Sequence, residues 1–292
     1  MPEVGDAPLL EYDDVSVTYR KRGRPDFLAL DSVSFTLRRG ESLGVVGESG
    51  SGKTTLGRVP FGLVPVTGGR VTFDGEDLLA ATRKERRALT ARMQMVFQDP
   101  YGSLNPSKTV GETLVEPLMV HSVGADMRER RARVGDALEL VGLERTAAHR
   151  YPREFSGGQR QRVAVARAII IRPDLLVCDE SVSALDLSVQ AQILNLLADL
   201  RTELGLGMIF ISHDLNVVRH VADRILVVYR GRIVEEGSQS DVAEHPQHPY
   251  TEALMAAVPV PDPIEQAARR AALSRRRVAD GSAPGSEVGA LT

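Results

Sequence analysis

Short apolar segments with β-type spacing dominate the first hundred residues of the chain. Leu9–Tyr19 carries scattered Val and Tyr, Ser34–Leu37 alternates between polar and apolar residues, and Glu41–Val46 runs into a glycine-rich turn. One run ends at Asp74-Gly75, a dipeptide typical of a tight turn between two strands. We expect strands at Leu9–Tyr19, Ser34–Leu37, Glu41–Val46, Val71–Phe73 and Met93–Phe97.

The pattern changes near residue 107, where the chain becomes rich in Glu and Arg up to about residue 150. Leucine and valine recur there at helical spacing, at Leu114, Leu118, Val134, Leu138 and Val141, which predicts a helical insertion. Strand-like and helix-like segments then alternate, which indicates a mainly parallel sheet flanked by helices. Strands are expected at Leu175–Asp179, Met208–Ser212 and Ile225–Tyr229, helices at Gln159–Ile171 and Val189–Leu204, and a final hairpin at Arg230-Gly231 leading into Arg232–Glu236.

Composition places the chain among globular proteins, with 292 residues, 42% apolar and 26% charged. A net charge of −3 argues against a dedicated nucleic-acid binder. The one cysteine, Cys178, lies in an apolar run and cannot build a disulfide framework, which favours a reducing compartment. No run approaches the ~18–20 apolar residues that span a bilayer, so we expect a cytoplasmic chain that needs another chain to cross a membrane.

A glycine-rich segment between a predicted strand and a predicted helix fits the pattern GxxxxGK[ST] of a phosphate loop. Glycines let consecutive backbone N–H groups surround a phosphate, and the helix start adds its own N–H groups. Lys53 would bring its charge to the β- and γ-phosphates of ATP, and the Thr54 hydroxyl would bind Mg²⁺. A structural Gly/Ser turn is the alternative, which the strand-to-helix setting disfavours. The loop consists of Gly47, Glu48, Ser49, Gly50, Ser51, Gly52, Lys53 and Thr54.

Two acids end the apolar run Leu175–Cys178. The carboxyl end of a parallel strand is where α/β folds place their ligands. Asp179 would hold Mg²⁺, directly or through water, and Glu180 would poise a water molecule for attack on the γ-phosphate.

Ser156-Gly157-Gly158-Gln159, preceded by Phe155, resembles the signature sequence of ABC ATPases. It stands between the phosphate loop and the acid pair, as in that family. Further segments resemble family elements over residues of about 8–260. They are Gln98 of the Q-loop, Ser183–Asp186 of the D-loop, the switch His213, and Tyr19, where the family stacks a ring on adenine.

The resemblance implies an α/β fold with a P-loop NTPase core of ABC type, an antiparallel β subdomain, a helical subdomain insertion and a short C-terminal extension. The expected parts are residues 8–106 and 159–237 for the two portions of the core, 107–158 for the helical subdomain, 238–262 for a C-terminal motif and 263–292 for a flexible tail.

The resemblance also implies shared ATP sites. Each ATP, with Mg²⁺, would lie between Lys53 of one chain and Ser156 of a second, similar or identical ATPase chain. His213 would contact the γ-phosphate, and Gln98 would sense Mg²⁺ and the attacking water. Thr55, Gly157, Gly158, Gln159 and Asp186 complete the expected nucleotide-binding residues.

Three segments resemble ATPases of oligopeptide, dipeptide and nickel importers, namely Gln98–Pro106, Tyr151–Phe155 and His245–Thr251. Such importers pair two ATPase subunits with two membrane permeases and, indirectly, an extracytoplasmic solute-binding protein. The chain would therefore work at the cytoplasmic face of the membrane in peptide uptake. Uptake of nickel or another small solute, and a soluble non-transport ABC ATPase, stay open as alternatives. Ser181-Val182 departs from the family's usual Pro-Thr after the glutamate.

Overall fold

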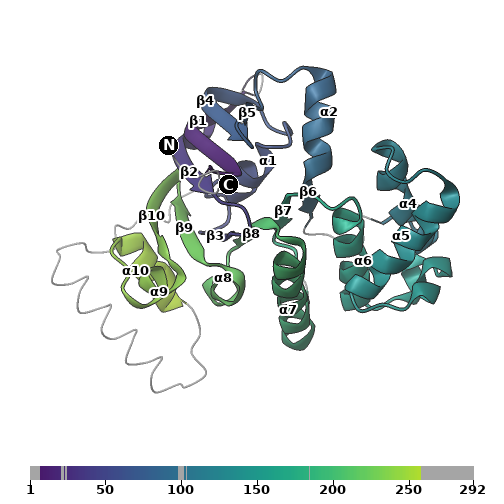
Figure 1. Cartoon of the computed structure of the whole chain (residues 1–292). Helices are drawn as coiled ribbons and strands as arrows, with labels where there is room; N and C mark the ends of the chain where they lie inside the picture. The colour runs from purple at the N-terminus through teal and green to yellow at the C-terminus, as the bar shows by residue number, and fades with distance from the viewer. Residues whose placement is uncertain are drawn as a thin grey trace.

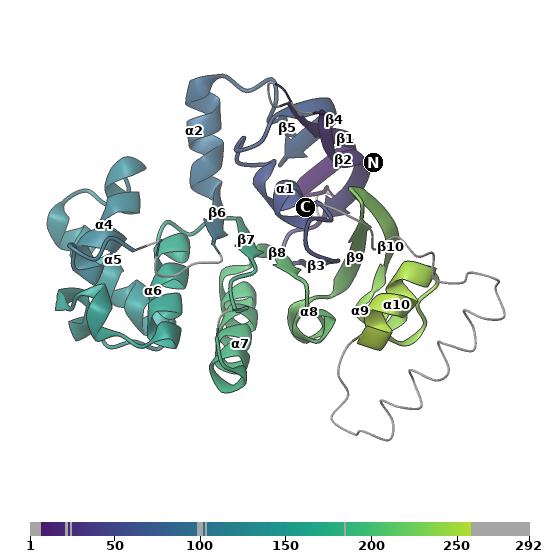
Figure 2. The same ribbon diagram turned by 180° about the vertical axis from the view of Figure 1, so that it is seen from behind.

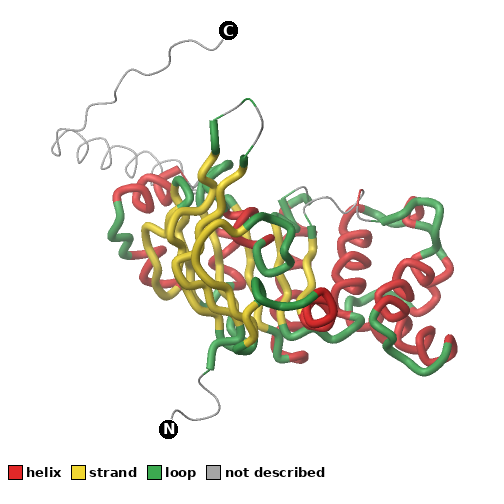
Figure 3. Tube along the Cα trace, turned by 90° about the horizontal axis from the view of Figure 1, so that it is seen from above, coloured by secondary structure: helices red, strands yellow, loops and turns green. Residues whose placement is uncertain are grey.

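A computed structural model describes residues 7–20, 23, 25–97, 102, 104–183 and 185–257 of the chain. Its elements form an antiparallel sheet, a second and mainly parallel sheet, and a group of helices beside them (Figure 1). Seen from above, the strands form one block, and the α4–α6 region lies to its right (Figure 3). This arrangement confirms the predicted α/β fold.

The antiparallel sheet has the strand order β2-β1-β4-β5. Asp74 and Gly75 join its last two strands with φ values of 53° and 79°, the left-handed pair that a tight hairpin turn requires. The second strand begins at Phe27, seven residues before the predicted Ser34. The prediction started too late because Phe27 and Leu28, both apolar but exposed, break the alternation of apolar and polar residues. The strands are β1 (Leu10–Tyr19), β2 (Phe27–Leu37), β4 (Val66–Phe73) and β5 (Glu76–Asp77).

The second sheet has the order β10-β9-β3-β8-β7-β6. Its strands pair in parallel except for β10, which folds back on β9 through the predicted turn at Arg230-Gly231. The predicted parallel sheet and final hairpin are therefore confirmed. The strands are β3 (Ser42–Val46), β6 (Met93–Val96), β7 (Leu175–Asp179), β8 (Gly207–Ser212), β9 (Arg224–Tyr229) and β10 (Arg232–Ser238).

The central strands are buried on both faces and feed two cores. In β7, Val177 packs in the core shared with the antiparallel sheet, while Leu176 and Cys178 pack in the core shared with the helices. The neighbouring strand β8 alternates in the same way, with Ile209 on one side and Phe210 on the other. Each fully buried side chain of this size contributes roughly 1.5–3 kcal/mol. This two-sided burial explains why these strands are nearly continuous apolar runs.

The predicted helical insertion contains α4 (Val110–Val120) and α5 (Met127–Leu140). The helix expected at Gln159–Ile171 is present as α6 (Gly157–Ile169). Thr109 and Glu112 form a reciprocal capping box at the start of α4. All three helices lie together on one side of the parallel sheet (Figures 1 and 2). Two short 3₁₀ turns, at Arg145–His149 and Pro152–Glu154, connect α5 to α6.

The remaining helices cover the sheets and end the described chain. The pair α9 and α10 packs beside the β9–β10 hairpin, on the side away from α4–α6 (Figures 1 and 2). Among the helices of the described residues, none has the length and apolar character that crossing a bilayer requires. These helices are α1 (Lys53–Arg58), α2 (Arg83–Arg92), α7 (Leu187–Leu204), α8 (Leu215–Val221), α9 (Gln239–Glu244) and α10 (Pro249–Ala257).

Candidate functional site

The candidate residues of the core meet at the carboxyl edge of the parallel sheet. Strand β3 ends at Val46, which pairs with Ser212 at the end of β8, and β7 ends at Asp179, which pairs with Ile211. The phosphate loop, Glu180 and His213 are therefore the first residues beyond one common edge. Ligands of open α/β sheets bind at this position.

The phosphate loop, Gly47–Thr54, needs glycine at the positions where the pattern has it. Gly47 and Gly52 have φ values of 153° and 112°. A Cβ atom on Gly47 would lie 2.2 Å from the carbonyl oxygen of Val228, and one on Gly52 would lie 2.6 Å from that of Ala29. The backbones of β9 and β2 thus lie directly against the loop, and only glycine leaves room for this close approach.

Lys53 lies inside the loop with 4% of its surface exposed. Its Nζ donates hydrogen bonds to the carbonyl oxygens of Gly47 and Glu48, both at 2.7 Å. Burial lowers the pKa of Lys53, while the charges of Glu180, Asp179 and Glu48 act in the opposite direction. The ammonium group is therefore held between the loop carbonyls and the acid pair.

Thr54, in α1 after β3, and Asp179, at the end of β7, meet at this edge. The Thr54 hydroxyl donates to Asp179 Oδ1 at 3.1 Å, and Arg58 Nη2 lies 3.8 Å from the other carboxylate oxygen. Asp179 is 4% exposed, and this burial raises the pKa of its carboxyl group. A hydroxyl and a carboxylate oxygen are the ligand types that Mg²⁺ prefers. The donor set fits the metal that the sequence predicted here.

Glu180 and His213 also lie together, because β7 and β8 are neighbours in the sheet. His213 Nδ1 is 3.5 Å from Glu180 Oε1. Glu180 has a left-handed φ of 47°, and its N–H donates to the carbonyl oxygen of Ile211 at 3.0 Å. Ser183 donates to the Glu180 carbonyl oxygen from both its N–H and its hydroxyl. Main-chain bonds on both sides therefore hold Glu180 in this turn.

Tyr19 lies next to the start of α1. Its hydroxyl is 3.4 Å from Thr55 Oγ1, and 37% of the residue is exposed. In the loop, Ser49 and Gly50 are exposed, whereas Ser51 is buried. A partly exposed phenol ring thus lies beside Thr55, directly after the phosphate loop.

The signature residues form a second group at the start of α6. Ser156 Oγ accepts from the Gln159 N–H at 3.3 Å, and Gln159 Oε1 accepts from the Ser156 N–H at 3.0 Å. A Cβ atom on Gly158 would lie 2.4 Å from Val189 of α7, so the glycine permits close packing of the two helices. Asp186 caps α7 by accepting from the Val189 N–H at 3.0 Å.

The two groups lie apart within one chain. Strands β6 and β7 separate the start of α6 from α1 (Figures 1 and 2). The structure does not place Ser156, Gly157, Gly158 or Gln159 against the phosphate loop of the same chain. Gln98, predicted as a catalytic and metal-binding residue, lies outside the described residues.

Two contacts to the phosphate loop were missed by sequence reasoning. The Tyr250 hydroxyl on α10 accepts a hydrogen bond from the Glu48 N–H at 2.8 Å. The Gly231 N–H in the β9–β10 turn donates to the Ser51 carbonyl oxygen at 2.8 Å. The motif around Tyr250 was visible in the sequence, but nothing in it indicated a contact with the loop.

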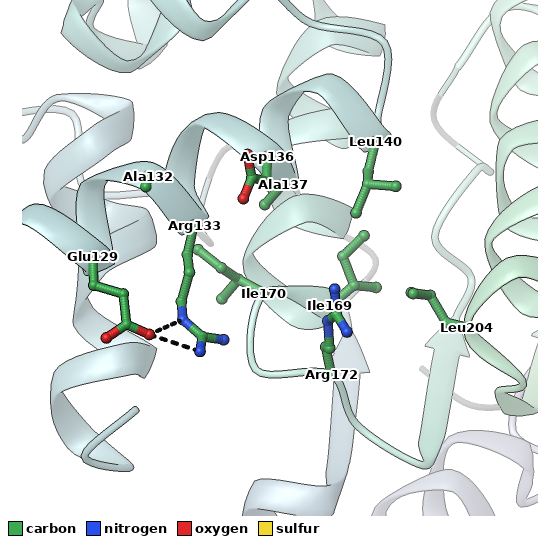
Figure 4. Close-up of a pocket in the computed structure, with 10 residues that line it drawn as sticks. All are labelled: Glu129, Ala132, Arg133, Asp136, Ala137, Leu140, Ile169, Ile170, Arg172 and Leu204. Atoms are coloured by element: carbon green, nitrogen blue, oxygen red, sulfur yellow. Dashed lines mark hydrogen bonds and ion pairs between the residues drawn. The ribbon is translucent and has the colours of Figure 1, made fainter. Parts of the chain in front are cut away.

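A pocket of about 390 Å³ lies away from these residues (Figure 4). It is formed by α5, the C-terminal end of α6 and Leu204 of α7, so it is at the opposite end of α6 from Ser156. Glu129 and Arg133, 2.9 Å apart, form an ion pair along its wall. None of the predicted site residues lines it.

A glycine loop after β3, an acid pair after β7, a histidine after β8 and a capped signature helix together define a P-loop ATPase of the ABC class. Residues 30–183 match the ABC transporter family. Residues 234–283 match the family described as oligopeptide/dipeptide transporter, C-terminal region. The chain therefore belongs to the ABC transporter ATP-binding family, in its oligopeptide/dipeptide group.

Individual relatives agree with this assignment. A putative peptide import ATP-binding protein of Brucella ovis is 49% identical over 265 residues, which are 91% of this chain and 83% of the relative. The oligopeptide transport ATP-binding protein OppF of Escherichia coli is 49% identical over 263 residues, covering 87% and 79% of the two chains. The dimeric ATP-binding cassette MJ0796, bound to ADP and Pi, is 31% identical with a TM-score of 0.71, over 79% of this chain and 98% of that one.

Proposed function

We propose that this chain binds and hydrolyses ATP to power the import of oligopeptides across the cytoplasmic membrane. The buried Lys53 inside the phosphate loop, beside the Thr54–Asp179 pair, supports the ATPase activity. The match of residues 234–283 to the oligopeptide/dipeptide C-terminal region supports the solute class over nickel.

The phosphate loop would bind the nucleotide through its backbone N–H groups and Lys53. Lys53 would exchange the two loop carbonyls for phosphate oxygens, which offer stronger charge-assisted bonds. Thr54 and Asp179 would hold Mg²⁺, which neutralises phosphate charge when bound. The half-exposed ring of Tyr19, next to Thr55, would stack on adenine.

Glu180 would act as the general base. Its side chain is 20% exposed, so it is positioned at the site and accessible to a water molecule. His213, 3.5 Å away, would contact the γ-phosphate and hold the Glu180 carboxylate in position beside it. Gln98, following β6, would sense the metal and the attacking water.

A second ATPase chain would complete each site. The separation of the signature residues from the phosphate loop leaves Ser156, Gly157, Gly158 and Gln159 available to a partner's nucleotide. Asp186, at the start of α7, would lie at this junction. The dimeric state of the relative MJ0796 with ADP and Pi supports the pairing. Two permease subunits and, indirectly, an extracytoplasmic binding protein would complete the importer, with this chain at the cytoplasmic face.

Peptide uptake in cells that lack this chain tests the proposal. Uptake of a labelled oligopeptide should be lost, and should return with the unchanged chain but not with Glu180→Gln. Glu203→Gln, which neutralises an exposed acid near the end of α7, is the matched control and should restore uptake. If cells that lack the chain took up peptide normally but no longer took up nickel, the proposed solute would be nickel rather than oligopeptides.

A further inference from the structure

The C-terminal helix α10 reaches the phosphate loop through one side chain. The Tyr250 hydroxyl accepts a hydrogen bond from the Glu48 N–H at 2.8 Å, although 202 residues separate the two. We propose that Tyr250 is a positioning residue, through which the C-terminal segment holds the phosphate loop in its nucleotide-binding conformation. This inference rests on the ATPase function proposed above.

The bond acts on a peptide group that is held from both sides. The Glu48 N–H belongs to the peptide that joins Gly47 to Glu48, and the carbonyl oxygen of that peptide accepts from Lys53 Nζ at 2.7 Å. Rotation of this peptide plane would break both bonds at once. Gly47, with its φ of 153°, has no side chain to restrict rotation of this peptide. Tyr250 therefore adds a restraint from outside the loop to the one that Lys53 supplies from within it.

Tyr250 is itself anchored to the β9–β10 hairpin. Its ring lies 4.2 Å from that of Tyr229, the last residue of β9. Its N–H donates to His248 Nδ1 at 3.1 Å, and the His248 N–H donates to Glu235 Oε2 of β10 at 3.0 Å. The histidine and tyrosine of the C-terminal motif are thus consecutive links from β10 to the loop.

The same hairpin contacts the other end of the loop. The Gly231 N–H donates to the Ser51 carbonyl oxygen at 2.8 Å, and the Gly231 carbonyl oxygen accepts from the Asp31 N–H at 2.9 Å. The hairpin and α10 therefore hold the loop at Glu48 and at Ser51. A binding loop fixed in advance loses less conformational freedom when its ligand binds, and so binds more tightly.

Loss of the Tyr250 hydroxyl should weaken nucleotide binding about two- to tenfold, the effect of one neutral hydrogen bond on an equilibrium. The loop would surround the β-phosphate, which ADP and ATP share, so binding of Mg-ADP and Mg-ATP should weaken alike. The kcat should change little, because Glu180 and His213 are held by β7 and β8 rather than by α10. The KM for ATP should rise without a matching fall in kcat.

The experiment compares Tyr250→Phe with Tyr229→Phe in the full chain. Both variants keep the ring pair and lose one hydroxyl, but only the Tyr250 hydroxyl bonds to Glu48. Equilibrium binding of a fluorescent ADP analogue with Mg²⁺ should weaken in Tyr250→Phe alone. Hydrogen exchange of the Glu48 amide, measured without nucleotide, should accelerate in the same variant.

Unchanged affinity and unchanged Glu48 exchange in Tyr250→Phe would overturn the inference. Equal weakening in both variants would assign the effect to packing of the ring pair and would also overturn it. Failure of the unchanged chain to bind nucleotide would reject the ATPase proposal itself, together with this inference.

Discussion

Replacement of Glu180 by glutamine tests the proposed general base with little disturbance to the fold. The residue is held in its left-handed turn by main-chain bonds to Ile211 and Ser183, which the substitution leaves intact. The amide oxygen can occupy the position of Oε1, 3.5 Å from His213. The substitution therefore removes one negative charge and one proton acceptor, and little else.

The expected loss follows from the role assigned to the carboxylate. General-base catalysis contributes about 10²–10⁴-fold, which corresponds to about 3–5.5 kcal/mol of transition-state stabilisation. ATP binding should be retained or strengthened, because Glu180 places a negative charge near Lys53 and Asp179, where the phosphates would bind. Rate and affinity should thus separate.

Single-turnover phosphate release, followed together with equilibrium ATP binding, separates the two quantities. Glu203→Gln, on the exposed side of α7, is the charge-matched control and should resemble the unchanged chain in both. Turnover of Glu180→Gln within about threefold of the control would refute the reasoning, since another group would then activate the water. Loss of ATP binding would contradict the argument that the fold is preserved.

Two further predictions concern stability and pH. Tyr12 is buried and its hydroxyl donates to the Leu56 carbonyl oxygen at 2.7 Å, so Tyr12→Phe should lower the free energy of unfolding by about 1 kcal/mol, measured by urea denaturation. An unchanged midpoint would show that this bond adds nothing. Burial raises the pKa of Asp179, so on acidification this carboxylate takes up a proton at a higher pH than in the unfolded chain. This proton uptake favours the folded state, but it displaces Mg²⁺ from the carboxylate. The Mg²⁺-dependent part of ATP affinity should therefore fall as the pH decreases through this raised pKa. In a Mg²⁺ titration, Asp179→Asn should lack this pH dependence, and equal pH profiles of the two proteins would contradict the assignment of Asp179 as a Mg²⁺ ligand.

The sequence predicted those parts of the fold in which local pattern and burial agree. Runs such as Leu175–Asp179 and Met208–Ser212 are apolar because both faces of the strand are covered, and their limits matched the structure to within a residue. The burial of Cys178 was also confirmed, and burial raises the pKa of its thiol to about 12. Helices α2 and α8–α10 were missed, because α8, α9 and α10 have only seven, six and nine residues and α2 buries only Leu89.

The site could be predicted as a set of residues but not as a set of contacts. Motif spacing placed Glu180 and His213 at strand ends, yet their proximity depends on β7 and β8 being neighbours, which the order of segments alone leaves open. The contact of Tyr250 with Glu48 depends in the same way on where α10 packs. Such contacts follow from tertiary register, which is set by the whole sheet rather than by any local pattern.

The pairing of β3 has a consequence for the newly made chain on the ribosome. Strand β3, which leads into the phosphate loop, pairs with β8 and β9, and the loop then contacts Tyr250, 202 residues after Glu48. At about 5–20 residues per second, translation of that interval takes about 10–40 s. During this time the loop and the apolar strand before it have been synthesised but lack their partners. The nucleotide site therefore reaches its full affinity only after α10 has been synthesised, and until β8 and β9 emerge, β3 has no strand partner in the parallel sheet.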